Sequence, residues 1–178
     1  MKKILVFFFI LIFFTACEKK EQPTTTTKSS NQTTQKESLH TTYELREQNR
    51  TIKIMFSNNT FKIEGTKKVA LLLFFTSWCP GCKAEMEELQ KLHNKYGQKI
   101  DIIALQLDQN KSSAPFFISH NININNKIAD RVYPLLHLPA SKPIPVMILL
   151  QDGRYVIHYV GATPIEMVEM DIKKALGE

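Results

Sequence analysis

A buried strand that leads directly into a pair of cysteines constrains the fold of this chain more than any other feature. Residues 69–75 are all apolar, which predicts a strand covered on both faces. Trp-Cys-Pro-Gly-Cys follows at 78–82, and helical spacing of apolar residues then continues from Pro80 to Tyr96, where Gly97 ends the helix. Two cysteines at this spacing can form a disulfide, and the helix N-terminus favours a thiolate over a thiol. The pattern therefore predicts one nucleophilic sulfur.

A second buried strand and a hairpin extend this unit. A second segment read as a buried strand, Ile100–Leu107, follows the helix, which predicts a βαβ unit with a right-handed crossover. Open sheets of this kind place functional groups at the carboxyl ends of their strands, where the cysteines lie. Further on, Asp152-Gly153 separates Val146–Leu150 from Arg154–Val160, which predicts an antiparallel hairpin.

Weaker patterns flank these elements. Three short alternating segments favour an N-terminal β-hairpin or meander: 43–45, 52–56 and 61–63. Between the second buried strand and Pro145, local patterning favours a short helix at Ala114–His120, an Asn-rich break, and another helix at Lys127–Leu136.

A capping pattern predicts the last helix, which ends at Leu176. Thr163 is expected to be its N-cap, Pro164 its first residue and Glu166 the partner of Thr163 in a capping box.

The N-terminus has the pattern of a bacterial export signal. Met1-Lys2-Lys3 precedes eleven apolar residues, Ile4–Phe14, and then Thr15-Ala16-Cys17. Eleven residues of helix reach roughly 16 Å, about half of a hydrocarbon core, which disfavours a permanent span. The end of the segment resembles the lipobox of bacterial lipoproteins, whose cysteine is acylated. We expect residues 1–16 to be a signal peptide and Cys17 to carry a lipid; an incidental cysteine or a disulfide partner is the alternative.

The next segment is polar and predicts a tether. Residues 18–40 contain almost nothing apolar and cannot bury enough surface to offset the entropy of ordering. We expect a lipidated flexible tether over 17–40 and a folded domain over 41–178. The protein would then be lipid-anchored in the cell envelope on the periplasmic side, and we expect the inner rather than the outer membrane.

Composition argues against several other classes of protein. The formal net charge is +6, but the lysines are scattered without interleaved aromatic residues, which argues against nucleic-acid binding. The chain has 3 cysteines, so a site of four cysteine ligands for zinc is impossible. Four histidines show no metal-ligand spacing: His93, His120, His137 and His158. We expect neither a metal site nor a cofactor.

These motifs together resemble the thioredoxin fold, and more narrowly its TlpA/ResA/CcmG-like branch of membrane-anchored extracytoplasmic thiol-disulfide oxidoreductases. The resemblance covers residues 41–178, and it is sharpest at 78–85, which match the pattern W-C-x-x-C-K-x-E. It implies an α/β thioredoxin-like fold with an N-terminal β-hairpin extension and a βα insert before the cis-proline strand. Most relatives kink the active-site helix with a proline five residues after the second cysteine, whereas Glu87 stands at that position here.

The resemblance also implies roles at the dithiol. Cys79, the more exposed sulfur, would attack a partner's disulfide, and the more buried Cys82 would resolve the mixed disulfide. Glu85 would be a carboxylate that assists proton transfer, with a solvated helix residue as the alternative. The buried acid that thioredoxin carries on the preceding strand is absent, because Leu73 occupies that register.

Three further residues are expected to contact the substrate. Pro145 is carried over as the cis-proline, and its geometry would present the backbone of Ile144 to an incoming peptide. Trp78 would pack beside the dithiol, either at the substrate site or as a core aromatic residue.

The leading functional hypothesis is a reductase of protein disulfides, supplied with electrons by a membrane donor of the DsbD/CcdA type, because a CxxC pair in an oxidising compartment needs a reductant. Cytochrome c biogenesis is one expected setting. Three alternatives remain at this stage: exchange in the oxidase direction, a Sco-like copper assembly protein, and a redox-inactive adaptor. The Sco type carries C-x-x-x-C with a distant histidine, which this spacing does not match.

Overall fold

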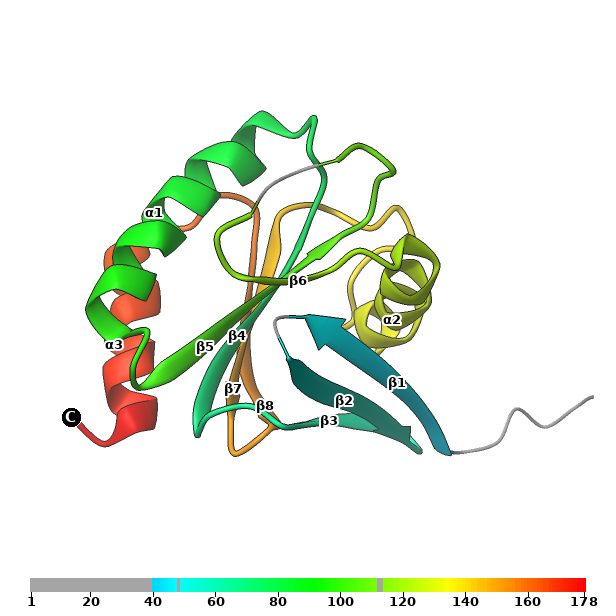
Figure 1. The fold of residues 1–178 in the computed structure, drawn as a ribbon, viewed down its shortest axis with the longest axis horizontal. Helices are drawn as coiled ribbons and strands as arrows, with labels where there is room; N and C mark the ends of the chain where they lie inside the picture. The colour runs from blue at the N-terminus through cyan, green and yellow to red at the C-terminus, as the bar shows by residue number, and fades with distance from the viewer. Residues whose placement is uncertain (1–39, 48, 112–113) are drawn as a thin grey trace, which may run out of the picture. The chain divides into compact units, whose positions relative to one another are not determined.

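An eight-stranded mixed sheet organises the chain (Figure 1). The computed structural model describes residues 40–47, 49–111 and 114–178. The elements in chain order are β1 (His40–Glu47), β2 (Arg50–Ser57), β3 (Thr60–Glu64), β4 (Val69–Phe75), α1 (Pro80–Tyr96), β5 (Ile100–Gln106), β6 (Phe117–Ser119), α2 (Ile122–Leu135), β7 (Val146–Gln151), β8 (Arg154–Val160) and α3 (Ile165–Leu176). Their spatial order is β1-β2-β3-β8-β7-β4-β5-β6. The predicted thioredoxin-like α/β architecture is confirmed.

The two central predictions are confirmed almost to the residue. β4 and β5 pair in parallel on either side of α1 in the chain, as the βαβ pattern requires. β7 and β8 form an antiparallel hairpin. Asp152 and Gly153 both have positive φ, of 51° and 73°, as a two-residue hairpin turn of this type demands.

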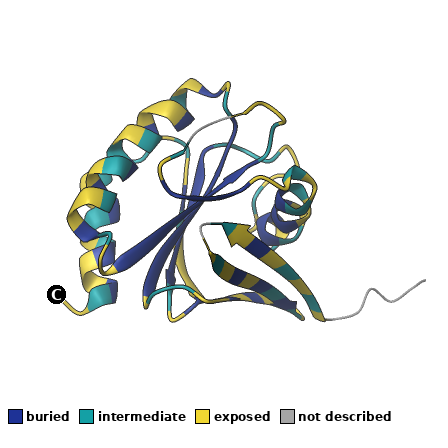
Figure 2. Cartoon of the chain, in the orientation of Figure 1, coloured by how far each residue is buried: buried dark blue, intermediate teal, exposed yellow. Residues whose placement is uncertain are grey.

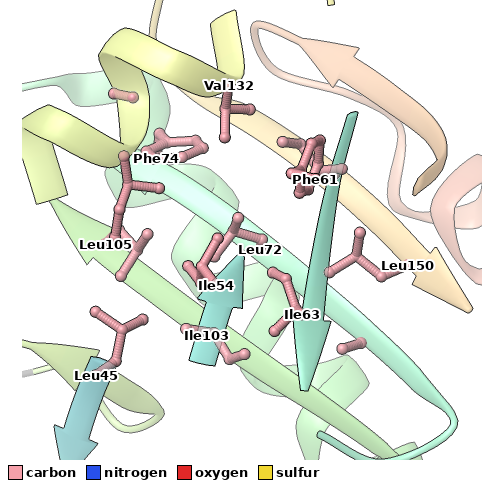
Figure 3. Packing of buried hydrophobic residues seen from close by; sticks show 14 of the residues in the cluster. Leu45, Ile54, Phe61, Ile63, Leu72, Phe74, Ile103, Leu105, Val132 and Leu150 are labelled. Carbon is pink, nitrogen blue, oxygen red and sulfur yellow. The ribbon is translucent and has the colours of Figure 1, made fainter. Parts of the chain in front are cut away.

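Successive side chains of β4 point alternately into two separate hydrophobic cores. The strand is therefore buried along its whole length (Figure 2). Leu71 and Leu73 belong to the cluster formed with α1 and α3. Leu72 and Phe74 belong to the cluster on the other face, with α2 and the N-terminal strands (Figure 3). β4 therefore lies inside the sheet between the two cores, and the cysteines follow its carboxyl end.

The N-terminal meander closes the second core. β1, β2 and β3 pair antiparallel in sequence order, and β3 meets β8 at Lys62 and Arg154. Their inward residues, Leu45, Ile54 and Ile63 among them, pack toward β4 (Figure 3). The sheet curls, so that Nε2 of His120, beside β6, lies 3.2 Å from Oε1 of Glu47 at the end of β1.

The helix expected at Ala114–His120 is wrong: residues 117–119 form β6, which pairs in parallel with β5. This is the βα insert that the family resemblance implied. A strand of three residues has no periodicity of its own, and its stability comes from the neighbouring strand, which local patterning cannot register.

The expected Asn-rich break is also wrong, because those asparagines form the start of α2. Asn121 is the N-cap, and its Oδ1 accepts the N–H of Ile124 at 3.1 Å. Asn125 is fully buried, and its amide donates to the carbonyls of Gln106 and Ser119 at 2.9 and 2.7 Å. The helix therefore begins five residues before the expected start.

The capping box expected at the last helix does not form. Pro164 is the N-cap of α3, and no side chain caps the helix. The Thr163 hydroxyl instead donates to the Gly161 carbonyl at 3.3 Å, and the Thr163 N–H is bonded to Glu85. A tertiary contact has replaced the local one.

The predicted signal peptide at 1–16 and the acylated Cys17 lie outside the described residues, as does the tether up to residue 39; His40, expected in the tether, begins β1. Within the ranges that the structure describes, no helix is both long enough and apolar enough to cross a bilayer.

Candidate active site

Cys79 and Cys82 are joined by a disulfide at the N-terminus of α1, with their Cα atoms 5.2 Å apart. Cys79 is the N-cap residue, and its Sγ accepts the N–H of Cys82 at 3.1 Å. Pro80, which lacks an N–H, stands in the first turn, where helices leave such donors unbonded. The unpaired N–H groups and the dipole of α1 therefore converge on the Cys79 sulfur.

Both sulfurs are shielded in this oxidised form. Cys79 is 6% exposed and Cys82 is 1% exposed. Both pack in the cluster that α1 forms with α3 and the sheet. The order of exposure agrees with an attacking Cys79 and a resolving Cys82, although the attacking sulfur is less open than the sequence suggested.

The Ile144–Pro145 bond is cis, as expected, and the contact of Pro145 with a substrate stays a prediction. A Cβ placed on Gly81, between the two cysteines, would lie 3.8 Å from Pro145 Cδ, so the proline ring borders the dithiol. The Pro145 carbonyl accepts the N–H of Gly161 at 2.9 Å. Ile144 is half-buried against the same cluster. The start of β7 and the end of β8 thus meet beside the CxxC motif.

Glu85 lies one turn after Cys82 and is 3% exposed, so the solvated alternative is wrong. Its Oε2 accepts the N–H of Thr163 at 3.3 Å, and its Oε1 has no hydrogen-bond partner among the described residues. Burial raises the pKa of Glu85; the Thr163 hydrogen bond opposes that rise and the charge of Glu88 adds to it. Glu85 is therefore a carboxyl that can hold a proton more readily than a surface glutamate.

Trp78 is 64% exposed, one residue before the attacking sulfur. The alternative prediction, that Trp78 is a core aromatic residue, is therefore wrong. The Trp78 ring is therefore open to any partner that approaches Cys79, and its contact with a substrate stays a prediction.

Sequence reasoning missed Asp108, which lies just past the end of β5. Its carboxylate accepts the Ser77 N–H at 2.8 Å and the Ser77 hydroxyl at 2.5 Å, two residues before Cys79. The signal was available, because a polar residue directly after a buried parallel strand belongs to the carboxyl edge of the sheet, where the cysteines also lie.

The described residues contain no group of three or more His, Cys, Asp or Glu side chains placed to hold a metal ion. The groups that the structure brings together at this edge of the sheet are two sulfurs, the buried Glu85 carboxyl and the start of α1.

The family model for AhpC/TSA proteins matches residues 27–141, which contain both cysteines. The chain belongs to the AhpC/TSA family. The match ends before Pro145, so the family model does not cover the cis-proline that the structure shows.

Individual relatives of this AhpC/TSA chain include thiol-disulfide proteins. It is 28% identical over 110 residues to "Thiol-disulfide oxidoreductase ResA" of Bacillus thuringiensis strain Al Hakam, covering 60% of this chain and 63% of the relative. It is 24% identical over 120 residues to thioredoxin of Bacillus subtilis strain 168, covering 67% of this chain and 94% of the relative. The chain therefore matches less than two thirds of the length of ResA.

Among solved structures, the AhpC/TSA chain is similar to a Chlorobium tepidum protein assigned as thiol:disulfide interchange protein DsbE. The TM-score is 0.54 at 20% identity, over 76% of this chain and 94% of the other. At that identity the similarity shows a shared fold.

Proposed function

We propose that the protein is a membrane-anchored, extracytoplasmic thiol-disulfide oxidoreductase that reduces disulfides in other proteins. The observation that carries the proposal is the Cys79–Cys82 disulfide at the N-terminus of α1, bordered by the cis-linked Pro145. The family membership and the ResA relatives support the same chemistry.

The reaction begins with the reduced pair. The Cys79 thiolate attacks one sulfur of a substrate disulfide; that S–S bond breaks, and the departing substrate sulfur takes up a proton. The Cys82 thiolate then attacks the Cys79 sulfur of the mixed disulfide. This step releases the second substrate sulfur, which is also protonated. Two electrons have passed to the substrate, and Cys79 and Cys82 are left as the disulfide that the structure contains.

Glu85 is the group we assign to proton transfer. The Cys82 thiol must lose its proton before it attacks, and Glu85 follows it by one helical turn. Its raised pKa brings the carboxyl closer to neutrality, where it can accept and return a proton.

The cycle needs a reductant for the Cys79–Cys82 disulfide. We propose a membrane donor of the DsbD/CcdA type, which would supply the two electrons by the same exchange chemistry. The proposed location follows from the sequence of residues 1–17, an export signal that ends in a cysteine suited to acylation.

A trapping experiment tests the substrate class. Cys82→Ala should leave the mixed disulfide at Cys79 unresolved, so that covalent, thiol-sensitive adducts with exported proteins accumulate in cells. Cys79→Ala is the matched control and should trap far fewer. Equal trapping by both variants, or none by either, would contradict exchange initiated by Cys79.

The reduction potential decides the direction. A reductase should have a reduction potential of about −270 mV, the thioredoxin value, whereas a strong oxidant has a reduction potential of about −120 mV. A value at the oxidising end removes the reductase assignment.

The anchor is tested separately, because Cys17→Ser should abolish labelling by a radioactive fatty acid and release the protein from the membrane fraction.

A further inference from the structure

The β4–β5 ladder is continued past its end by a side chain. Backbone pairing stops at Phe75 and Gln106, and the Leu107 N–H still donates to the Phe75 carbonyl at 2.9 Å. At the next position, the acceptor is the Asp108 carboxylate, which takes both the N–H and the hydroxyl of Ser77. Asp108 thereby occupies the place of the next strand residue and ties the segment after β4 to β5.

The tied segment is the turn that precedes the attacking sulfur. The Cys79 N–H donates to the Thr76 carbonyl at 3.4 Å, a long bond, so Ser77 and Trp78 are the two central residues of a weakly closed turn. The two bonds from Ser77 to Asp108, at 2.8 and 2.5 Å, are shorter than the bond that closes the turn itself. The position of the turn therefore depends more on Asp108 than on its own backbone.

Asp108 is itself held from the other side. The buried Gln106 amide donates to Asp108 Oδ1 at 3.0 Å, and the Gln106 carbonyl accepts the amide of Asn125 in α2. Burial opposes ionisation of Asp108, but the hydrogen bonds from Ser77, Gln106 and the Asn110 backbone together outweigh it and lower the pKa. The carboxylate is charged at neutral pH, which strengthens each bond it accepts.

We propose that Asp108 is a positioning residue that holds the Ser77–Trp78 turn, so that Trp78 is presented to a partner and the Cys79 sulfur stays at the N-cap of α1. Its importance for exchange rests on the proposed function. The geometry that Asp108 maintains does not depend on the proposed function. The Cys79 sulfur accepts the Cys82 N–H only while Cys79 keeps its N-cap conformation.

The chain offers a direct probe of this turn, because Trp78 is its only tryptophan. The test uses the full chain carrying Asp108→Ala, Asp108→Asn or Ser77→Ala. Asp130→Ala is the control, since it removes an aspartate from α2 whose partner is Lys142. Two quantities are measured: the fluorescence anisotropy of Trp78, and the rate at which neutral iodoacetamide alkylates Cys79 in the reduced protein, followed by mass spectrometry of the Cys79 peptide.

Asp108→Ala should lower the anisotropy and slow the alkylation about threefold or more, because the nucleophile leaves its favoured geometry. Asp108→Asn retains an acceptor for the Ser77 N–H and should restore most of both values, although it removes the charge. Ser77→Ala deletes one of the two bonds and should give a smaller change in the same direction. This variant decides the matter if Asp108→Ala does not fold.

The proposal is overturned if folded Asp108→Ala matches Asp130→Ala in both quantities, or if Asp108→Asn is as impaired as Asp108→Ala. Neither quantity uses a protein substrate. A wild-type protein that fails to reduce protein disulfides would therefore reject the proposed function while leaving this test intact.

Discussion

Arg50 in β2 binds Asp101 in β5 through two side-chain hydrogen bonds, of 2.9 and 2.8 Å, across 51 positions of sequence. Asp101 is buried, and it also accepts the Lys67 N–H at 2.7 Å. β2 and β5 are not neighbours in the sheet, so this pair fastens the N-terminal meander to the central βαβ unit. It lies at the start of β5, whereas the dithiol follows the carboxyl end of the paired strand β4.

Removing the arginine should therefore loosen the meander without touching the dithiol. Arg50→Ala leaves Asp101 buried with only Lys67 as partner, and we expect a loss of about 2 kcal/mol in the free energy of unfolding. Arg46→Ala is the control, because its ion pair with Glu44 is exposed and is expected to contribute almost nothing. Urea denaturation measures both. Equal losses would show that the Arg50 pair has no special role.

The same pair predicts a dependence of stability on acid. Burial opposes ionisation of Asp101, but the bonds from Arg50 and Lys67 outweigh it and lower the pKa. A lowered folded pKa gives stability that is present above the unfolded pKa, about 3.9, and is lost as the pH falls through the folded value. The difference between wild type and Arg50→Ala should therefore be complete at pH 6 and shrink below about pH 4.

Glu85 should show the opposite sign. Because the folded pKa of Glu85 is raised, ionisation of Glu85 destabilises the folded state. This destabilisation is absent below the unfolded pKa of about 4.3, and it grows as the pH rises through the folded value. Glu85→Gln cannot ionise, so at pH 7 it should be more stable than wild type by on the order of 1 kcal/mol, with no gain at pH 4. Glu87 is exposed, so Glu87→Gln should not change the free energy of unfolding at pH 7 or at pH 4. A gain for Glu85→Gln that is independent of pH would contradict this assignment.

Trp78 should matter for partners rather than for folding. Trp78→Ala removes an exposed ring, and the free energy of unfolding should stay within about 0.5 kcal/mol of wild type. Under the proposed function, the rate of reduction of a protein disulfide should fall about tenfold, as expected for loss of an aromatic anchor. Tyr155→Ala, an exposed aromatic residue beside the hairpin turn, should leave that rate unchanged. Insulin reduction assays compare the three proteins.

Two glycines with similar backbone angles should respond differently to alanine. Gly153 has φ +73°, and an added Cβ would lie 1.9 Å from the Ile63 carbonyl oxygen. Gly161 has φ +79°, with nothing within 4 Å of an added Cβ. Gly161→Ala should cost about 1 kcal/mol for the positive φ alone, and Gly153→Ala at least about 2 kcal/mol more, because the β3 and β8 backbones must separate. Thermal unfolding distinguishes them, and equal melting temperatures would refute the close approach.

The elements predicted correctly are those whose pattern is local and long. The run at 69–75 and the spacing from Pro80 to Tyr96 contain enough residues for burial and helical period to be read directly, and the Asp152-Gly153 turn carries its own backbone requirement. The errors lie where a neighbour decides. β6 exists because β5 lies beside it, and the Thr163 N–H, which a capping box would pair with Glu166, is bonded to Glu85 instead.

The sequence by itself determined the βαβ unit and the dithiol at its helix start, because each depends on spacing along the chain; the cis bond before Pro145 was expected from the family resemblance, and the structure contains it. Only the tertiary structure decided that Glu85 is buried, that Trp78 stands in solvent, and that Asp108 holds the turn before Cys79. These properties depend on which strands lie side by side and in what register. Contacts between residues tens of positions apart leave no periodicity in the chain that joins them.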